Sequence, residues 1–272
     1  DKVGLFPKFD WPRVSSPYCV FDNDGNVVND IEAAEAQTCA EIEKAFELHG
    51  NKIAAIIIEP MQGEGGDNHF RNEFLEKLRA YADEREALLV FDEVQTGFYG
   101  SGKAWFWQHT TVKPDIVSFG KKTQVCGIYA NRRIDEVADN VFAKSSRINS
   151  TWGGNLVDMV RCTQFINIIE RDNITDLVNK VSDQVITGLR QISQSAGLIS
   201  SVRGKGSLIA FTLPSPEHRA AMLGAFMDAG VIALPCGKRS VRFRLPLVMT
   251  VEDADSLLNR TNDAVQALAM AV

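Results

Sequence analysis

Short apolar runs alternate with longer amphipathic segments along the middle of this 272-residue chain. Three runs, 53–58, 87–91 and 115–119, are rich in aliphatic and aromatic residues and too short for ordinary helices. Such runs are typical of strands that are buried on both faces of a parallel sheet. We expect a helix over 70–86, where apolar residues recur at helical spacing: Phe70, Phe74, Leu75, Leu78 and Ala82. Strand, helix, strand, connection and strand in this order predict a parallel α/β sheet.

The residues before the first run follow a different pattern. Residues 1–30 are rich in turn formers and carry large apolar residues without a regular period, so we expect an arm that lies across another part of the molecule. Residues 31–49 are rich in Ala and Glu and contain neither Gly nor Pro. This composition predicts a helix that ends near Gly50.

Two further helices are expected after the third run, over 156–169 and 174–192. The second has a single apolar stripe, formed by Ile174, Leu177, Val181, Val185, Leu189 and Ile192. Gly197 is placed to end this helix. Beyond it the pattern changes to short strands around 207–213 and 240–245, with a helix over 218–229 between them.

The last helix, over 251–270, opens on Thr250 and Asp253, which stand at the spacing of a capping box. The predicted elements divide the chain into three parts. These are an N-terminal arm and helix (1–50), a larger α/β portion (51–195) and a small C-terminal α+β domain (196–272).

Composition and charge narrow the classes of function. Hydrophobic residues make up 45% and charged residues 24% of the chain, which is ordinary for a globular protein. The net charge of −6 argues against nucleic acid or a membrane surface as a partner, since both require a basic surface. The longest aliphatic run, 53–58, is far shorter than the roughly 18 residues of a membrane span.

Cysteines and histidines indicate neither a disulfide scaffold nor a metal site. The five cysteines are scattered, odd in number and without a Cys-x-x-Cys motif, so we expect a reducing, cytoplasmic environment. The four histidines stand far apart in the sequence. We therefore expect no metal ion.

Candidate chemistry follows the three predicted strands, because ligands of open α/β sheets bind beyond the carboxyl ends of the strands. A glycine-rich turn with two carboxylates, 59–66, follows the first run, and Asp92 follows the second. Lys121 follows the third run and stands 29 residues after Asp92. Asp92 and Lys121 are thus expected to face one crevice.

A lysine at this place has two interpretations. It can be solvated or paired with Asp92, or it can be a partly desolvated Schiff-base lysine. A Schiff-base lysine with an aspartate for a pyridinium nitrogen is typical of pyridoxal 5'-phosphate chemistry. The turn 59–66 fits neither the Walker pattern nor Gly-x-Gly-x-x-Gly, so we do not interpret it as a nucleotide site.

Five blocks in order over about 150 residues carry a resemblance to a known family: EPMQGEGG (59–66), FDEVQTG (91–97), SFGK (118–121), STWGGN (150–155) and VRGKG (202–206). Together they resemble a class-III (ω-amino-acid) pyridoxal-phosphate aminotransferase of fold type I. The resemblance implies the C-terminal part of a large, mainly parallel-sheet domain followed by a small α+β domain. Three more blocks resemble the lysine 6-aminotransferase subgroup: FPKFDWPR (6–13), GKKTQVCG (120–127) and VADNVF (137–142).

The resemblance implies roles for four residues around the cofactor ring. Lys121 rather than Lys122 matches the catalytic Schiff-base lysine, because it directly follows a small residue. Asp92 matches the partner of the pyridine nitrogen, Val94 the apolar residue on one ring face, and Gln95 the residue near the 3-hydroxyl.

Ser150 and Thr151 match the position that reaches the cofactor phosphate across a subunit interface, which implies a homodimer with a shared active site. Arg242 matches the arginine that takes a substrate carboxylate, and its guanidinium suits a bidentate contact. Arg244, one strand period away, is the alternative ligand. Glu64 matches a gating glutamate that pairs with Arg242 for one substrate and swings away for the other.

The resemblance also implies residues that this sequence does not show. In the family, a Gly- and Ser-rich phosphate loop and a stacking aromatic residue lie in an N-terminal region, and nothing of that kind precedes Ile53. The chain begins with Asp1. We therefore expect a part of a longer enzyme or a remnant that lacks about the first two-fifths of a family member.

The implied reaction moves the 6-amino group of L-lysine to 2-oxoglutarate and yields glutamate and 2-aminoadipate 6-semialdehyde. Ornithine and 4-aminobutyrate are alternative donors for the same site. A non-catalytic scaffold and a nicotinamide-dependent dehydrogenase are rivals from other classes. The intact set of candidate residues argues against the scaffold, and the missing fingerprint glycines argue against the dehydrogenase.

Overall fold

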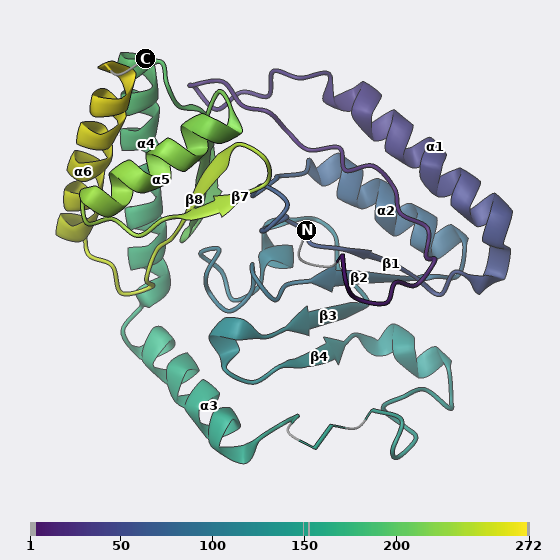
Figure 1. The fold of residues 1–272 in the computed structure, drawn as a ribbon. Coiled ribbons are helices and arrows are strands. Elements are labelled where there is room, and N and C mark those ends of the chain that lie inside the picture. Colours follow the sequence, from purple (N-terminus) through teal and green to yellow (C-terminus); the bar gives the residue numbers. More distant parts are fainter. Residues whose placement is uncertain (1–3, 149, 152, 271–272) are drawn as a thin grey trace.

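The protein is described from a computed structural model that covers residues 4–148, 150–151 and 153–270 (Figure 1). These residues form two four-stranded sheets, of order β1-β2-β3-β4 and β5-β6-β8-β7. The strands are β1 Ala55–Ile58, β2 Leu88–Asp92, β3 Ile116–Phe119, β4 Gly127–Ala130, β5 Ser200–Lys205, β6 Leu208–Thr212, β7 Leu234–Cys236 and β8 Ser240–Arg244. The α-helices are α1 Ile31–His49, α2 Asn72–Glu84, α3 Leu156–Arg171, α4 Ile174–Ala196, α5 Pro216–Asp228 and α6 Val251–Met270.

The first sheet contains the three predicted strands in parallel. Ile58 pairs with Phe91, and Asp92 pairs with Ser118, so the carboxyl ends of β1, β2 and β3 lie at one edge of the sheet. The parallel prediction is confirmed for these strands. The chain then turns back, and β4 pairs with β3 in the antiparallel direction. The sequence did not predict β4, because its four residues are too short and too mixed to show a strand period.

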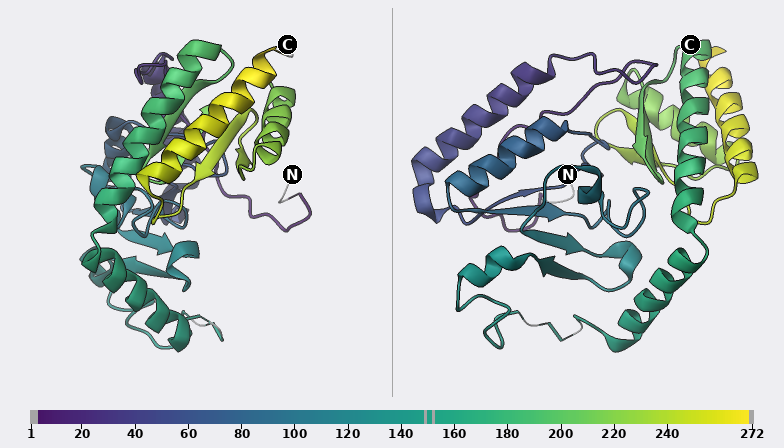
Figure 2. Two further views of the ribbon diagram at one scale, coloured as in Figure 1. Left: turned by 90° about the vertical axis from the view of Figure 1, so that its left-hand side faces the viewer. Right: turned by 180° about the vertical axis from the view of Figure 1, so that it is seen from behind.

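The prediction that the first run is buried on both faces is wrong. β1 is an edge strand, and its residues alternate between exposed and half-buried, with Ile57 66% exposed. Helices α1 and α2 lie side by side on one face of the sheet, where Ile42, Phe74 and Leu78 pack with Leu89 of β2 (Figures 1 and 2). The first run therefore has one covered face and one open face.

The second sheet is antiparallel and packs against α4, α5 and α6, as expected for a small α+β domain. Thr250 and Asp253 cap the start of α6 reciprocally, each backbone N–H donating to the other side chain at 3.0 and 3.1 Å. Gly197 ends α4 with φ 67°, as predicted. Strands β5 and β7 were not predicted, because Ser200–Lys205 is mostly polar or small and Leu234–Cys236 has only three residues, so neither shows a strand period.

Helix α4 packs with the second sheet rather than the first. Most buried residues of its apolar stripe, from Val181 to Ile192, share a core with Phe211 of β6 and Phe243 of β8, whereas Ile174 packs with Phe98 in the turn after β2. Helix α4 lies beside α6 (Figure 2). The boundary that we placed between residues 195 and 196 therefore separates this helix from the sheet that it covers. Along the described part of the chain, no helix is long and apolar enough to cross a membrane.

His69 lies in the interior between the arm and the second sheet, and it makes the fold sensitive to acid. Burial, together with the positive charges of Arg203 and Lys205, lowers its pKa to about 3. The unfolded chain binds the proton near pH 6.5, so this group destabilises the fold progressively as the pH falls from 6.5 towards 3.

We expect the His69→Leu variant to lose less stability on acidification than the wild type. The difference should approach about 1.4 kcal/mol per pH unit below the unfolded pKa. Urea unfolding midpoints at pH 7, 6 and 5 measure it, with His49→Leu as the control. If the wild type and the His69→Leu variant lost equal stability as the pH falls, the prediction would be contradicted.

Candidate functional site

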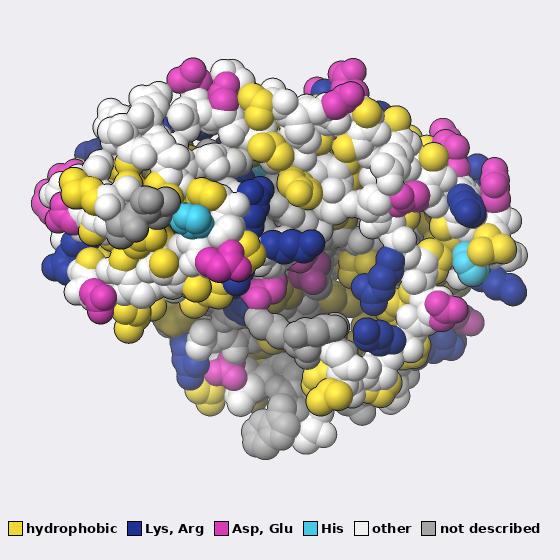
Figure 3. Space-filling view, turned by 45° about the horizontal axis from the view of Figure 1, so that its top comes forward, with side chains coloured by type: hydrophobic (Ala, Val, Ile, Leu, Met, Phe, Trp, Pro, Cys, Tyr) yellow, Lys and Arg dark blue, Asp and Glu magenta, His cyan; other side chains and the backbone are white. Residues whose placement is uncertain are grey.

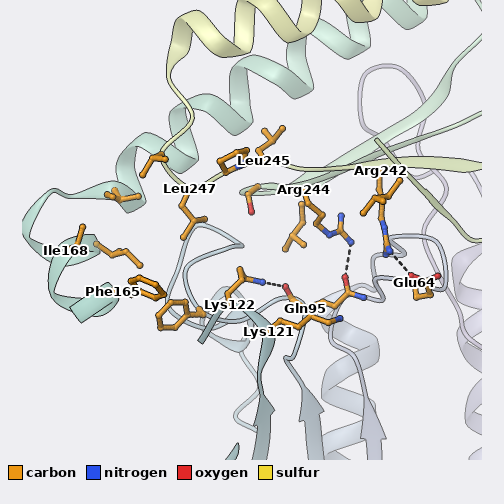
Figure 4. Close-up of a pocket in the computed structure, with 18 residues that line it drawn as sticks. Glu64, Gln95, Lys121, Lys122, Phe165, Ile168, Arg242, Arg244, Leu245 and Leu247 are labelled. Atoms are coloured by element: carbon orange, nitrogen blue, oxygen red, sulfur yellow. Dashed lines mark hydrogen bonds and ion pairs between the residues drawn. The ribbon is translucent and has the colours of Figure 1, made fainter. Parts of the chain in front are cut away.

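A cavity of about 650 Å³ lies where the carboxyl edge of the first sheet meets β8 of the second sheet (Figure 4). One side of it is apolar and is formed mainly by Phe98, Phe165, Ile168, Leu245 and Leu247. The other side carries the polar residues Glu64, Gln95, Lys121, Lys122, Arg242 and Arg244. Figure 3 shows Lys and Arg side chains gathered around a hollow near the middle of one face of the molecule.

Four of the sequence-predicted residues meet in this cavity. The turn after β1 supplies Glu64, the turn after β2 supplies Gln95, and Lys121 directly follows Gly120 at the end of β3. Strand β8 supplies Arg242. The convergence follows from the parallel order of the first sheet, which brings three turns to one edge.

Lys121 occupies a tight turn. Its φ of 53° lies in the left-handed region, which is sparsely populated by non-glycine residues and is a form of strain found at functional sites. A Cβ at Gly120 would lie 3.0 Å from Sγ of Cys126 and 3.7 Å from Cγ1 of Val94. The absence of a Cβ at Gly120 therefore makes room for the side chain of Cys126, and Val94 lies nearby. Lys121 is exposed, whereas the Schiff-base interpretation predicted a partly desolvated amine.

Lys122 is the less exposed of the two adjacent lysines. Its Nζ donates to the carbonyl of Gln95 at 2.5 Å. Burial lowers its pKa to about 8, and the charges of Arg244 and Lys121 act in the same direction. Lys122 thus ties the lysine turn to the turn after β2. Lys121 is therefore the one of these two lysines whose amine does not make this hydrogen bond.

Two side-chain carboxylates hold the turn after β2, those of Asp92 and the buried Glu93. The amide of Val94 donates to Oδ1 of Asp92 at 3.0 Å. Glu93 accepts from the amides of Phe106 and Trp107 at 2.5 and 3.0 Å, and burial raises its pKa to about 7. The sequence analysis did not single out Glu93, since a buried anchor and a solvated glutamate look alike in a sequence.

Glu59 places a second carboxyl group near Asp92. Burial raises the pKa of Glu59, and the negative charge of Asp92 raises it further, while Lys121 opposes the shift. Its Oε2 accepts from the amide of Gly63 at 2.9 Å. Glu59 therefore lies within electrostatic reach of both Asp92 and Lys121. Asp92 is not among the residues that line the cavity, so its facing the same crevice as Lys121 stays a prediction.

Glu64 and Arg242 form an ion pair of 2.6 Å between Oε2 and Nη2. The Glu64 side chain is 49% exposed, whereas that of Arg242 is only 9% exposed. Nε and Nη1 of Arg242 find no hydrogen-bond acceptor within the described residues. A buried guanidinium with unused donors can hold a further carboxylate.

Arg244 is engaged differently. Its two terminal nitrogens each donate to the carboxylate of Asp67 at 2.6 Å, and Nη2 also reaches Oε1 of Gln95 at 3.2 Å (Figure 4). Asp67 is buried, with 1% of its surface exposed. The sequence analysis missed Asp67, because no local pattern shows that a residue after Gly65 and Gly66 meets β8.

Arg203 is a second residue whose place the sequence did not show, although it stands in the VRGKG block. It is buried on β5 and donates to the carbonyls of Gly66, Asp67 and Ser201 and to two hydroxyl groups, those of Thr212 and Ser240. Burial lowers its pKa. Arg203 therefore holds the end of the turn that carries Glu64.

Ser150 and Thr151 do not line the cavity. Both are exposed, in the segment between the 3₁₀ helix Arg132–Glu136 and α3, and the Ser150 hydroxyl accepts from the amide of Gly153 at 3.0 Å. Trp152 of the same block lies outside the described residues. The role of Ser150 and Thr151 across a subunit interface stays a prediction.

Comparison with known proteins places the chain among aminotransferases. A family model described as "Aminotransferase class-III" matches residues 9–265. The L-lysine-epsilon aminotransferase of Mycobacterium tuberculosis is 44% identical over 260 residues, which are 95% of this chain and 57% of that protein. The enzyme of the same name from Streptomyces clavuligerus is 42% identical, over 100% of this chain and 60% of that protein. The mitochondrial 4-aminobutyrate aminotransferase of Rattus norvegicus is 32% identical over 93% of this chain and 50% of its own length.

Solved structures agree with the sequence matches. The lysine aminotransferase from M. tuberculosis in the internal aldimine form has a TM-score of 0.92 at 42% identity, over 97% of this chain and 60% of that one. An ornithine aminotransferase from Toxoplasma gondii has a TM-score of 0.75 at 25% identity, over 86% and 56%. The chain thus spans about 57% to 60% of the length of its lysine aminotransferase relatives.

Proposed function

Because the chain belongs to the class-III aminotransferase family, we propose that it acts in a pyridoxal-phosphate-dependent transfer of the 6-amino group of L-lysine to 2-oxoglutarate. The products are glutamate and 2-aminoadipate 6-semialdehyde. One observation supports this most strongly. An arginine with unused donors, its half-exposed carboxylate partner and the candidate catalytic lysine line the same cavity.

The residues at two neighbouring strand ends fit the cofactor. In this proposal Asp92 would accept from a protonated pyridine nitrogen, Val94 would contact one ring face, and Gln95 would lie near the 3-hydroxyl. Cγ1 of Val94 lies 3.7 Å from where a Cβ on Gly120, the residue before Lys121, would stand. When bound, pyridoxal phosphate supplies an electron sink that stabilises negative charge on the substrate carbon.

Lys121 is the group that moves protons in this proposal. Its amine would hold the cofactor as a nucleophile and, when the donor has taken its place, would serve as the general base at the substrate carbon. Asp92 keeps the proton on the pyridine nitrogen through its negative charge. Ser150 and Thr151 of a partner copy would reach the cofactor phosphate, so the proposed catalytic unit is a homodimer in the cytosol.

In this proposal, Glu64 and Arg242 allow one cavity to bind two unlike substrates in turn. The donor presents an amine end without a nearby carboxylate, and the acceptor then brings a carboxylate to the same cavity. Glu64 neutralises Arg242 during the first half-reaction. During the second it moves aside, which its half-exposed side chain permits, and Arg242 takes the carboxylate of 2-oxoglutarate.

We expect Glu64→Ala to change selectivity between amino donors. Without Glu64, Arg242 stays positive, so the half-reaction with L-lysine should slow by about 10-fold while that with L-glutamate is kept or improved. Single-turnover rates with each donor measure the effect, and Glu47→Ala on α1 is the control. An equal loss with both donors would refute the gating role.

The donor itself is tested by absorbance. The purified chain is titrated with pyridoxal phosphate, and the visible band of the lysine-bound cofactor is followed after addition of L-lysine, L-ornithine or 4-aminobutyrate. Fastest bleaching by L-lysine supports the proposed reaction. Fastest bleaching by another amine reassigns the donor on the same machinery, and no visible band contradicts cofactor binding by this chain.

A further inference from the structure

Two arginines of β8 enter the cavity side by side, and each faces one carboxylate. Arg242 faces Glu64 (Figure 4), and Arg244 faces Asp67. Both arginines line the same cavity, and alternate residues of a strand project from the same face of the sheet. Without the carboxylates, either guanidinium would offer an anion two parallel N–H donors.

The two pairs differ in how easily they open. The Glu64 side chain is 49% exposed, so water can replace Arg242 as its partner. Asp67 is 1% exposed, and both of its oxygens are used by Arg244. Breaking a buried pair leaves an uncompensated charge, which is far more costly than opening an exposed one.

The backbone of Asp67 is held as firmly as its side chain. Its amide donates to the carbonyl of Gly63 at 2.9 Å, and its carbonyl accepts from Nε of Arg203 at 2.9 Å. The amide of Gly237 also donates to the carbonyl of Glu64 at 3.0 Å. The turn is therefore anchored to the second sheet, and the movement that remains is that of the Glu64 side chain.

We propose that Asp67 is a specificity-determining positioning residue, which retains Arg244 in a permanent pair so that a substrate carboxylate finds only Arg242. The proposal rests on the proposed function. It adds the reason why only one of the two arginines of β8 binds the carboxylate of the acceptor. Asp67 lies 3.9 Å from Nη1 of Arg242, and through Arg244 it also orients the Gln95 side chain. Because only Arg242 is then available to a carboxylate, the cavity stays suitable for donors that have no carboxylate at that end.

The test uses glutarate, an unreactive five-carbon dicarboxylate, titrated calorimetrically into the cofactor-free chain. In Asp67→Asn, Arg244 is released as a second carboxylate ligand, so we expect glutarate to bind about 5- to 10-fold more tightly than in the wild type. In the double variant Asp67→Asn with Arg244→Met, both buried charges are absent, and the dissociation constant should return to within about twofold of the wild-type value. Asp263→Asn on α6 is the matched control.

The outcomes separate this proposal from the proposed function. Unchanged or weaker glutarate binding by the folded Asp67→Asn chain overturns the positioning role, with folding checked by circular dichroism. If Asp67→Asn does not fold, the double variant Asp67→Asn with Arg244→Met is the deciding measurement. A large loss of glutarate affinity in that variant would show that Arg244 itself binds the carboxylate, which overturns the proposal. No saturable binding by the wild type also overturns it. The cofactor band is measured independently, so the aminotransferase proposal stands or falls on its own readout.

Discussion

Replacing Lys121 with alanine is expected to abolish transamination, with a loss of at least about 10⁴-fold in kcat, and to remove the visible band that forms with pyridoxal phosphate. The reason is that, among the described residues that line the cavity, the one other lysine is held elsewhere. Lys122 lies next in the chain, but its Nζ is held by the carbonyl of Gln95. A stopped assay with 2-oxoglutarate and an absorbance spectrum measure the two effects.

Lys122→Met is the matched control for this prediction. It removes a neighbouring amine of the same type and leaves Lys121 in place, so the band should persist, with a smaller loss of activity from the loosened turn after β2. A band that survives in Lys121→Ala but disappears in Lys122→Met would reverse the assignment of the two lysines.

Replacing Arg242 with methionine is expected to lower kcat/KM for 2-oxoglutarate by about 10²- to 10³-fold. The loss arises because Arg242 is the buried cation whose Nε and Nη1 lack acceptors among the described residues, so it is the fork that a carboxylate can occupy. The half-reaction with L-lysine should fall less. Steady-state kinetics in the second substrate, combined with single-turnover rates for the donor, give both numbers.

Two comparisons sharpen the Arg242 result. Arg242→Lys keeps the charge and loses the planar fork, so it should recover only part of the affinity for 2-oxoglutarate. Arg244→Met disturbs the buried pair with Asp67 and should lower thermal stability. Should Arg242→Met leave the KM for 2-oxoglutarate unchanged, Arg242 is not the carboxylate ligand.

The asymmetry between the two arginines links the fold to selectivity. The turn after β1 belongs by sequence to the first sheet, yet Arg203 and Arg244 of the second sheet hold it. The cavity is thus completed only when the two sheets pack together. A substitution that loosens the second sheet should therefore alter substrate selectivity as well as stability.

Much of the fold was predictable, because its signals are local. Helix ends depend on caps within a few residues, and Gly50, Gly197 and the pair Thr250 and Asp253 act at the expected places. The strands β1, β2 and β3 were predictable from short apolar runs. Strands β4, β5 and β7 were not, because none of them shows a regular apolar pattern of its own, and each is defined by its pairing with a neighbouring strand.

The sequence by itself determined which residue types stand at the ends of three parallel strands, and hence that Gln95, Lys121 and Glu64 meet at one edge. The pairing of Glu64 with Arg242 was expected from the resemblance, but only the tertiary structure showed that Arg244 faces Asp67. Asp67 and Arg244 are 177 residues apart, and their pairing depends on how the second sheet docks on the turn after β1. Local periodicity carries no information on such docking, since it is set by burial and charge pairing between distant segments.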